Sequence, residues 1–470
     1  MKKKPNLLYV FADQMRGMDM GCVGNPDVHT PTLDRLAAEG VLCRNHFATT
    51  PVCCPNRGTL MTGTYPQTHH VLSNDLPIRD DLPTLGTITR DAGYHTGYIG
   101  KWHIDGMPRS KFTPPGPRRL GFDGFWAVHN CTHAYLATKY YRDTPELIEV
   151  EGYEPEIQTD LAMEYLDGRV AAGRDGDDSP FCLVMSWGPP HDPYDQQPQR
   201  YRDMYDPAKI QLRPNCQPDA MDPLIEAYGK PDARRAIADY YGHITALDEQ
   251  LGRLLAKLED TGVADDTLVV FGSDHGDMLW SHGRMMKQQP YHESVSVPLI
   301  MRWPNGLPAG EVNETLIGSV DLTPTFVGLM GIGENVDTFE GLNLAAAMRG
   351  EDVVTPTSVL LHQVLTCDQS AIIGLPEWRA VRTSRYTYVE TVGDKPWLLF
   401  DHEVDPFELR NLVDDPTSKP ILAQLHSLLH DWLKRTGDPF VSGEEMLSRL
   451  GLEEAWAYRQ EEMQAARRKR

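Results

Sequence analysis

Side chains suited to catalysis or metal binding follow four separate apolar runs of the 470-residue chain. In chain order they are Asp13-Gln14, Lys101-Trp102-His103, His191-Asp192 and Asp274-His275. The first and last pairs offer carboxylate, amide and imidazole donors, which suit Ca²⁺, Mg²⁺ or Mn²⁺ better than zinc. One such group alone is ordinarily a helix cap or a surface residue, so the prediction of a metal site depends on their convergence in space.

Four further features concern positive charge and proton transfer. Lys101 and His103 flank Trp102, and in an extended segment both would point to the same side. Lys101 would supply a fixed positive charge and His103 a titratable proton carrier. His191 and Lys287 add a second group of each kind. Beside a divalent metal, these groups predict a pocket for a tetrahedral oxyanion.

Two adjacent cysteines, Cys53 and Cys54, lie within the stretch TTPVCCPNRGTLMTG, residues 49–63. The stretch is typical of a strand-to-helix turn, with the helix beginning at Pro55 or the residue after it. A nucleophile near that helix N-terminus would be stabilised as an anion, and Arg57 could hold the same anion with two hydrogen bonds. Taken alone, the pair could also be half of a disulfide, a metal clip or buried thiols. The eight cysteines show no C-x-x-C spacing, which argues against a zinc ribbon and a disulfide scaffold.

The elements that must position these groups alternate between strands and helices. Apolar runs typical of strands begin at Asn6, Tyr94, Pro180 and Thr267, and helical patterns cover residues 30–40, 82–93 and 231–260. This alternation predicts an α/β fold with a large mixed, mostly parallel sheet sandwiched by helices. Because ligands bind beyond the carboxyl ends of such strands, the polar groups should meet at one edge of the sheet.

From about Thr355 the pattern changes to the polar alternation of antiparallel strands. An amphipathic helix follows over residues 419–437, and residues 453–470 form a charged helix or a frayed tail. We therefore predict a catalytic α/β domain over residues 1–354. A smaller C-terminal α+β subdomain with an antiparallel sheet is predicted over residues 355–470.

Composition argues against two classes of partner. The formal net charge of −22 argues against binding to nucleic acid, and no run of about 18 apolar residues predicts a membrane span. The N-terminal MKKKPNLLYVFADQ lacks the long apolar core of a secretory signal, so we expect a cytoplasmic protein. A periplasmic or secreted chain trimmed of its signal would look the same. The sequence leaves the oligomeric state open.

Two motifs resemble the signatures of the type I sulfatases. Cys53, Pro55 and Arg57 lie in CCPNRGTLMTG, which is similar to that family's C-x-P-S-R-x-x-L-x-T-G. GYHTGYIGKWH, residues 93–103, resembles the second signature, G-Y-x-T-x-x-I-G-K-W-H. FADQ, PPHDPY, SDHGD and LFDHEVDPFELRNLV occur in the family's usual order. The resemblance covers nearly the whole chain and implies an alkaline-phosphatase-like fold.

Three positions depart from the family pattern. Asn56 stands where serine or alanine is usual, Gln14 where many members have aspartate, and His275 where many have asparagine. Asp-Gln and Asp-His pairs occur elsewhere in the superfamily, including in phosphonate monoester hydrolases. A hydrolase of phosphonate monoesters or phosphodiesters is therefore the nearest alternative. An inactive binding protein with the same fold is a remote one.

The resemblance implies a modified nucleophile and a metal. A formylglycine-generating or anaerobic sulfatase-maturating enzyme would oxidise Cys53 to formylglycine, whose hydrate would attack the sulfur of a sulfate monoester. One divalent metal is implied, with Ca²⁺ favoured and Mg²⁺ or Mn²⁺ possible. The implied metal ligands are Asp13, Gln14, residue 53, Asp274 and His275. The implied catalytic residues are Cys53, Arg57, Lys101, His103, His191 and Lys287.

The resemblance also implies roles and a substrate class. Lys101 and Lys287 would neutralise the sulfuryl oxygens, and His191 would assist the leaving alcohol. His103 would remove the proton of the second hydroxyl, so that the intermediate collapses to aldehyde and free sulfate. A sulfated carbohydrate is the favoured substrate, with aryl sulfates as models. Candidate substrate contacts are Asn74, Asp75, Arg109 and Asp192, and the segment 103–125 is expected to line the pocket.

Overall fold

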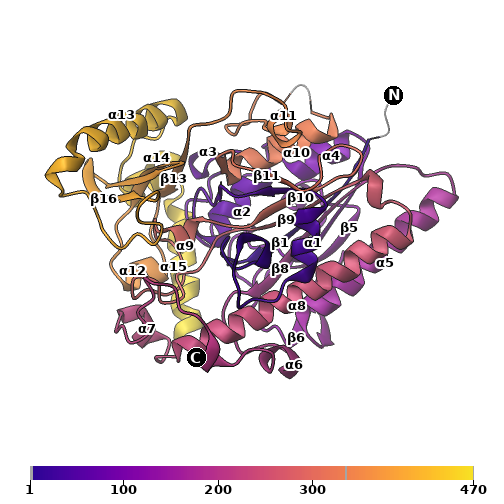
Figure 1. Ribbon diagram of the computed structural model, residues 1–470. Helices are drawn as coiled ribbons and strands as arrows, with labels where there is room; N and C mark the ends of the chain where they lie inside the picture. The colour runs from indigo at the N-terminus through magenta and orange to yellow at the C-terminus, as the bar shows by residue number, and fades with distance from the viewer. Residues whose placement is uncertain (1–3, 334–335, 469–470) are drawn as a thin grey trace.

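The computed structural model describes residues 4–333 and 336–468. Residues 1–3 and 334–335 of the predicted catalytic domain and residues 469–470 of the predicted C-terminal subdomain lie outside the described residues. Its main feature is an eight-stranded sheet with the order β11-β2-β10-β9-β1-β8-β4-β5 (Figure 1). The strands are β1 (Asn6–Asp13), β2 (Val41–Cys43), β4 (His95–Lys101), β5 (Phe125–His129), β8 (Phe181–Pro190), β9 (Thr267–Ser273), β10 (Leu299–Arg302) and β11 (Glu311–Asn313).

The centre of this sheet is parallel. β1 pairs in parallel with β8 and β9, and β4 pairs in parallel with β8 and β5. β10 runs antiparallel to β9 and β2. All eight residues of β1 are buried, as expected for a continuous apolar strand covered on both faces. The predicted mixed, mostly parallel α/β sheet is therefore confirmed.

Helices cover both faces because successive side chains of a strand point in opposite directions. Leu8 and Val10 pack into a cluster with helices α1 (Pro31–Ala38), α5 (Glu154–Arg174) and α8 (Ala233–Asp260). Leu7 and Tyr9, on the opposite face of β1, pack into a second cluster. That cluster includes helices α2 (Cys53–Thr62), α4 (Leu85–Asp91) and α10 (Leu322–Met330).

A second sheet follows towards the C-terminus, at the left of the view in Figure 1. Its four strands are β13 (Ser358–Gln363), β14 (Trp378–Thr383), β15 (Tyr386–Thr391) and β16 (Lys395–Asp401), all antiparallel in this order. The helices of this region are α13 (Lys419–Thr436), α14 (Gly443–Leu450) and α15 (Glu453–Arg468). The predicted antiparallel sheet and amphipathic helix are thus present, and the segment predicted as a charged helix or frayed tail is helical to residue 468.

Shorter elements connect these layers. The strands are β3 (His46–Phe47), β6 (Ala137–Tyr140), β7 (Ile148–Glu151) and β12 (Ile317–Gly318). The helices are α3 (Pro66–His69), α6 (Gln199–Arg202), α7 (Pro223–Ala227), α9 (His292–Val295), α11 (Ala345–Met348) and α12 (Gln369–Ile372). Within the described part of the chain, 3₁₀ helices cover residues 21–23, 117–119, 207–209, 264–266, 319–321 and 416–418.

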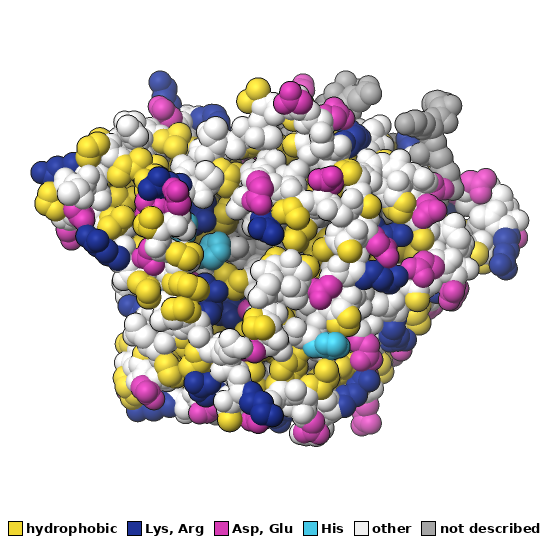
Figure 2. Space-filling model, viewed as in Figure 1, with side chains coloured by type: hydrophobic (Ala, Val, Ile, Leu, Met, Phe, Trp, Pro, Cys, Tyr) yellow, Lys and Arg dark blue, Asp and Glu magenta, His cyan; other side chains and the backbone are white. Residues whose placement is uncertain are grey.

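The surface bears on the predicted partners. Figure 2 shows acidic and basic side chains interspersed over the face in view, without an extended basic patch there. Among the residues that the structure describes, every helix is too short or too polar to cross a lipid bilayer.

Gly100, the residue before Lys101 in β4, allows the main chain to approach β8 closely. Its φ is +101°, and a Cβ there would lie 2.1 Å from the carbonyl oxygen of Ser186. We expect Gly100→Ala to lower the free energy of unfolding by about 2–4 kcal/mol, measured by urea denaturation. Gly168→Ala is the control, since nothing lies near its added Cβ in α5, and it should stabilise the protein by up to about 1 kcal/mol. Equal urea midpoints for Gly100→Ala and the wild type would contradict this reading of β4.

Candidate active site

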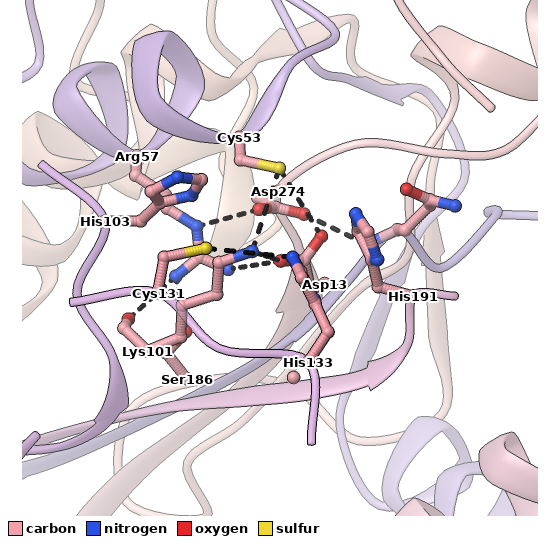
Figure 3. A network of polar contacts seen from close by, with 12 residues as sticks. Asp13, Cys53, Arg57, Lys101, His103, Cys131, His133, Ser186, His191 and Asp274 are labelled. Atoms are coloured by element: carbon pink, nitrogen blue, oxygen red, sulfur yellow. Dashed lines mark hydrogen bonds and ion pairs between the residues drawn. The ribbon is translucent and has the colours of Figure 1, made fainter. Parts of the chain in front are cut away.

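Four strands deliver polar side chains to one edge of the main sheet. β1 ends at Asp13 and β4 at Lys101, while His191 and Asp274 directly follow β8 and β9. These four strands are parallel, so their carboxyl ends meet at the same edge. Figure 3 shows the side chains from these strand ends converging on Cys53. The structure therefore brings together the four polar groups singled out from the sequence.

Cys53 lies in the first turn of α2, which begins at Cys53 itself, two residues earlier than expected from Pro55. Its Sγ is 3.1 Å from Nε2 of His275, 3.8 Å from Oδ1 of Asp13 and 3.9 Å from Nζ of Lys101. Burial raises the pKa of the thiol, but Lys101, Lys287 and His275 outweigh it and hold that pKa well below its usual value. The position therefore favours an anionic nucleophile.

Arg57, one turn further along α2, fixes two buried carboxylates. Its Nε lies 2.9 Å from Oδ2 of Asp274, and its Nη2 lies 3.2 Å from Oδ2 of Asp13. Nη1 donates to the main-chain carbonyl of Lys101 at 2.8 Å and to Oγ of Ser186 at 2.5 Å. Arg57 thus orients the carboxylates, whereas the sequence suggested that it would hold an anion directly.

The side chains of Asp13, Cys53, Asp274 and His275 offer ligand atoms that all lie within 4.8 Å of one another. Burial and the charge of Asp13 raise the pKa of Asp274, although His275 and Arg57 oppose this shift. Two buried carboxylates in such proximity gain from a nearby divalent charge. The donor set is therefore suited to a divalent metal ion, and the carboxylate oxygens favour a hard cation.

Gln14 follows β1 with a φ of +71°. Its amide nitrogen donates to Oδ2 of Asp277 at 2.6 Å, and its amide oxygen accepts a hydrogen bond from Lys287. The side chain is thus held between an acidic and a basic group at the site. Its role as a metal ligand stays a prediction.

Lys287 also contacts His191, with 2.7 Å between Nζ and Nε2. The other ring nitrogen of His191, Nδ1, lies 2.7 Å from the carbonyl oxygen of Asp192 and 3.0 Å from its carboxylate. Burial and Lys287 lower the pKa of His191, but Asp192 and Asp13 outweigh them and raise it to about 9. The pair can therefore carry a proton at neutral pH.

His103 is held by an acidic residue behind it. The strand ends at Lys101, and His103 has a φ of +57°, so the two side chains are not positioned by a continuous extended segment. Nε2 of His103 lies 3.1 Å from Oδ1 of Asp75. Its Nδ1 is without a hydrogen-bond partner among the described residues. Nδ1 is therefore the ring nitrogen available for proton transfer.

Both carboxylate oxygens of Asp75 have hydrogen-bond partners within the protein. Besides His103, it accepts hydrogen bonds from Nε and Nη2 of Arg109 at 2.9 and 2.8 Å, and Arg459 of α15 lies 3.5 Å away. Asp75 is 2% exposed and does not line the cavity above Cys53. Asp75 therefore positions His103 and Arg109, and a direct contact with substrate stays a prediction. Buried carboxylates require such partners to offset the loss of solvent.

A cavity of about 1220 Å³ opens above Cys53, and we call it the catalytic cavity. Predicted site residues that line it are Cys53, Asn74, His103, Arg109, His191, Asp192 and Lys287. The 103–125 segment contributes residues 107–110 to the wall. Asn74 also accepts a hydrogen bond from the backbone nitrogen of Cys54 at 3.0 Å, which ties the wall to α2. The cavity is large enough for a ligand of several rings.

The residues at the site that were missed in the sequence include Cys131, His133, Ser186 and Arg459. Cys131 and His133 follow β5 and line the cavity, and His133 stacks on His191 with ring centroids 4.2 Å apart. Burial raises the pKa of Cys131, but His103, Lys101 and Arg109 lower it to about 6. The single polar side chain of Ser186 within the run CLVMSW was a signal that could have been used. Arg459 carried no local signal.

We expect Asp13→Asn to weaken Ca²⁺ binding at least about 100-fold, because loss of a direct carboxylate ligand should cost more than loss of a supporting group. The measurement is calorimetric titration of protein freed of metal with a chelator. Asp352→Asn, an exposed carboxylate elsewhere, is the control and should bind like the wild type. Equal Ca²⁺ affinity of Asp13→Asn and the wild type would rule out this donor set.

Comparisons with known proteins agree with the geometry. Residues 5–332 match a family model described as Sulfatase, and residues 276–435 match one described as N-sulphoglucosamine sulphohydrolase, C-terminal. An ulvan-active sulfatase of Formosa agariphila is 36% identical over 95% of this chain and 84% of its own length. An endo-4-O-sulfatase of Bacteroides thetaiotaomicron is 29% identical over 94% of each chain. A crystal structure from Bacteroides fragilis, assigned to the sulfatases, matches with a TM-score of 0.83 and 30% identity over 94% of this chain and 98% of that one.

Proposed function

The chain belongs to the sulfatase family and is a sulfuric ester hydrolase, and we propose that it removes sulfate from a sulfated carbohydrate. The observation that carries the proposal is the placement of Cys53, His103, His191 and Lys287 in the lining of a cavity of about 1220 Å³. That volume exceeds what a single small sulfate ester requires. Relatives described as acting on ulvan support the choice of a glycan substrate.

Residue 53 is the proposed nucleophile, as formylglycine made by a separate maturation enzyme. An aldehyde at this position, when hydrated, supplies a hydroxyl that can attack sulfur. Two features of the chain support this choice. Cys53 has the spacing to Pro55 and Arg57 found in the family signature, and its side chain is the one directed at Asp13 and His275.

Asp13, Asp274, His275 and residue 53 would hold the metal, together with Gln14, and Ca²⁺ is favoured because the donors include two carboxylates. When bound, such a cation supplies positive charge that stabilises negative charge on the nucleophile and on the sulfuryl group. Arg57 keeps both carboxylates in place through its contacts at 2.9 and 3.2 Å. It therefore preserves the geometry of the donors.

Two lysines and two histidines would neutralise negative charge and transfer protons during cleavage of the ester. Lys101 and Lys287 lie beside Cys53 and would neutralise the charge that develops on the sulfuryl oxygens. The His191–Lys287 pair, in contact at 2.7 Å, would donate the proton that the leaving alcohol oxygen needs. His103 would accept a proton at Nδ1, while Asp75 holds its other nitrogen at 3.1 Å.

The walls of the cavity suggest how a glycan is held. The side chain of Arg109 is 31% exposed, and its Nε and Nη2 are already fixed by Asp75. Its remaining nitrogen, Nη1, is pre-organised to bind a carboxylate or a second sulfate of the glycan. Asn74 and Asp192, which line the same cavity, are candidates for hydroxyl groups. Further along the wall, Arg202 and Arg235 both pair with Asp239, which lines the cavity beside them.

The two adjacent cysteines should differ in their effect on activity. Cys53→Ala should abolish sulfate release, since the nucleophile is removed. Cys54→Ala should keep most activity, because Cys54 is a buried thiol that accepts a hydrogen bond from the main chain of Asp75 at 3.2 Å, and its loss leaves residue 53 in place. Sulfate release and mass spectrometry of the peptide containing residue 53, after coexpression with a maturation enzyme, are the two measurements. An active Cys53→Ala protein would refute the assignment.

The class of ester can be tested by kcat/KM on a panel. The panel contains sulfated mono- and oligosaccharides, an aryl sulfate, an aryl phosphonate monoester and a phosphate diester. We expect sulfate esters to react with the highest kcat/KM, and sulfated saccharides to outperform the aryl sulfate because their rings and charges contact the walls. A higher kcat/KM for the phosphonate or the diester would favour the alternative hydrolase.

A further inference from the structure

A second group of metal-ligating side chains lies in the C-terminal region. Glu390 belongs to β15, and His426 and His430 belong to α13, which packs against β14 and β15. Residues four apart lie on the same face of a helix, so both imidazoles face the strand that carries Glu390. Figure 1 shows α13 at the outer end of this region, at the upper left of the view. The group is therefore separate in the fold from the edge that carries Cys53.

The three side chains already converge on one point. Nδ1 of His426 lies 2.6 Å from Oε1 of Glu390, and Nε2 of His430 lies 3.1 Å from Oε2. The two imidazole rings have centroids 4.2 Å apart. One ligand atom from each side chain lies within 4.8 Å of the others. Each carboxylate oxygen thus faces a different imidazole nitrogen.

The carboxylate of Glu390 is buried, so its negative charge needs a positive charge nearby to offset the loss of solvent. Its side chain is fully buried, and Tyr388 donates a hydrogen bond to Oε1 at 2.8 Å. Within residues 4–333 and 336–468, neither lysine nor arginine forms an ion pair with it, so His426 and His430 are the partners that can carry a positive charge. A buried carboxylate without a fixed opposite charge is costly. A bound cation would remove that cost.

Access and additional donors are available at the same place. The side chains of His426 and His430 are 44% and 36% exposed, so an ion can reach them from solvent. Asp394, whose side chain is 60% exposed, has an oxygen 4.0 Å from Nε2 of His430. To bind zinc at about 2.0–2.2 Å, each imidazole nitrogen would have to move away from the Glu390 oxygen that it now contacts by less than about 1 Å. The two histidine rings are partly exposed, so they have room for this movement.

We propose that Glu390, His426 and His430 bind one Zn²⁺ ion that fastens α13 to β15. Two imidazoles and one carboxylate are a typical ligand set for zinc, with a water or Asp394 completing the tetrahedron. This set differs from the two-carboxylate group at the sheet edge, which suits a harder cation. The role of the ion is structural, and the proposal does not depend on the reaction catalysed elsewhere in the chain.

The experiment separates the two sites by using the Asp13→Asn background, in which the sheet-edge donors are weakened. Chelator-treated protein is titrated calorimetrically with Zn²⁺ alone, and its melting temperature is recorded with and without Zn²⁺. We expect one Zn²⁺ to bind, and the melting temperature to rise by about 2–4 °C at a hundredfold excess over Kd. Adding the His426→Ala and His430→Ala changes should remove both the binding and the rise.

Two further variants keep the result interpretable. Glu390→Gln retains the size of the side chain but removes its charge, and it should weaken Zn²⁺ binding at least about tenfold. His29→Ala removes an exposed histidine outside the group and should leave Zn²⁺ binding unchanged. If the proteins with and without the two α13 histidines bind Zn²⁺ equally, in number and affinity, the proposal is overturned. The three side chains would then form a hydrogen-bonded cluster only.

Discussion

The burial of two neighbouring carboxylates, Asp13 and Asp274, is the constraint on which the catalytic edge depends. Both are fully buried, so their charge must be offset by groups of the protein. Arg57 contacts both of them, and Lys101 pairs with Asp13 at 2.5 Å. Because Arg57 belongs to α2 and Lys101 to β4, the same charges that stabilise the carboxylates also fix the helix against the sheet. Cys53, one turn before Arg57, is thereby directed at the strand ends.

The site has two structural parts with different origins along the chain. The reacting groups come from the ends of parallel strands and from the first turn of α2, where buried neighbours leave little freedom. The walls of the catalytic cavity come from loops and helices, including α7, α8, α12 and α15. Since loops and peripheral helices change without disturbing the sheet, this division allows one chemistry to serve different substrates. Substrate choice should therefore be sought in the walls.

Sequence patterns were sufficient where a local rule determines the structure. The continuous apolar run at residues 6–13 is β1, and the helical spacing within residues 231–260 is α8. The predicted start of α2 at Pro55 was two residues too late, because proline is favoured throughout the first turn of a helix. In α2, Pro55 is the third residue of that turn and Cys53 is the first. The boundary between the predicted domains at residue 354 stays a prediction.

Contacts between distant segments were beyond the sequence patterns. Asp75 could be selected as a polar residue near the motifs, but its pairing with His103, Arg109 and Arg459 depends on three separate segments of the chain. The charge pattern of α15 indicated a helix and gave no sign that the helix lines the cavity with Glu462, Met463 and Ala466. The segment predicted as a charged helix or a frayed tail is thus a helix that forms part of the cavity wall.

That wall has a consequence for the order of events during synthesis. The N-terminal part of the chain, with Cys53, leaves the ribosome long before α15, whose Arg459 ties the last helix to Asp75. In the finished protein Cys53 is 2% exposed, at the base of a cavity that α15 helps to enclose. The maturation enzyme proposed for Cys53 would therefore meet an accessible substrate in the nascent chain and an enclosed one once α15 has docked. On that proposal, the docking of α15 against Asp75 would close the period in which the nucleophile can be made.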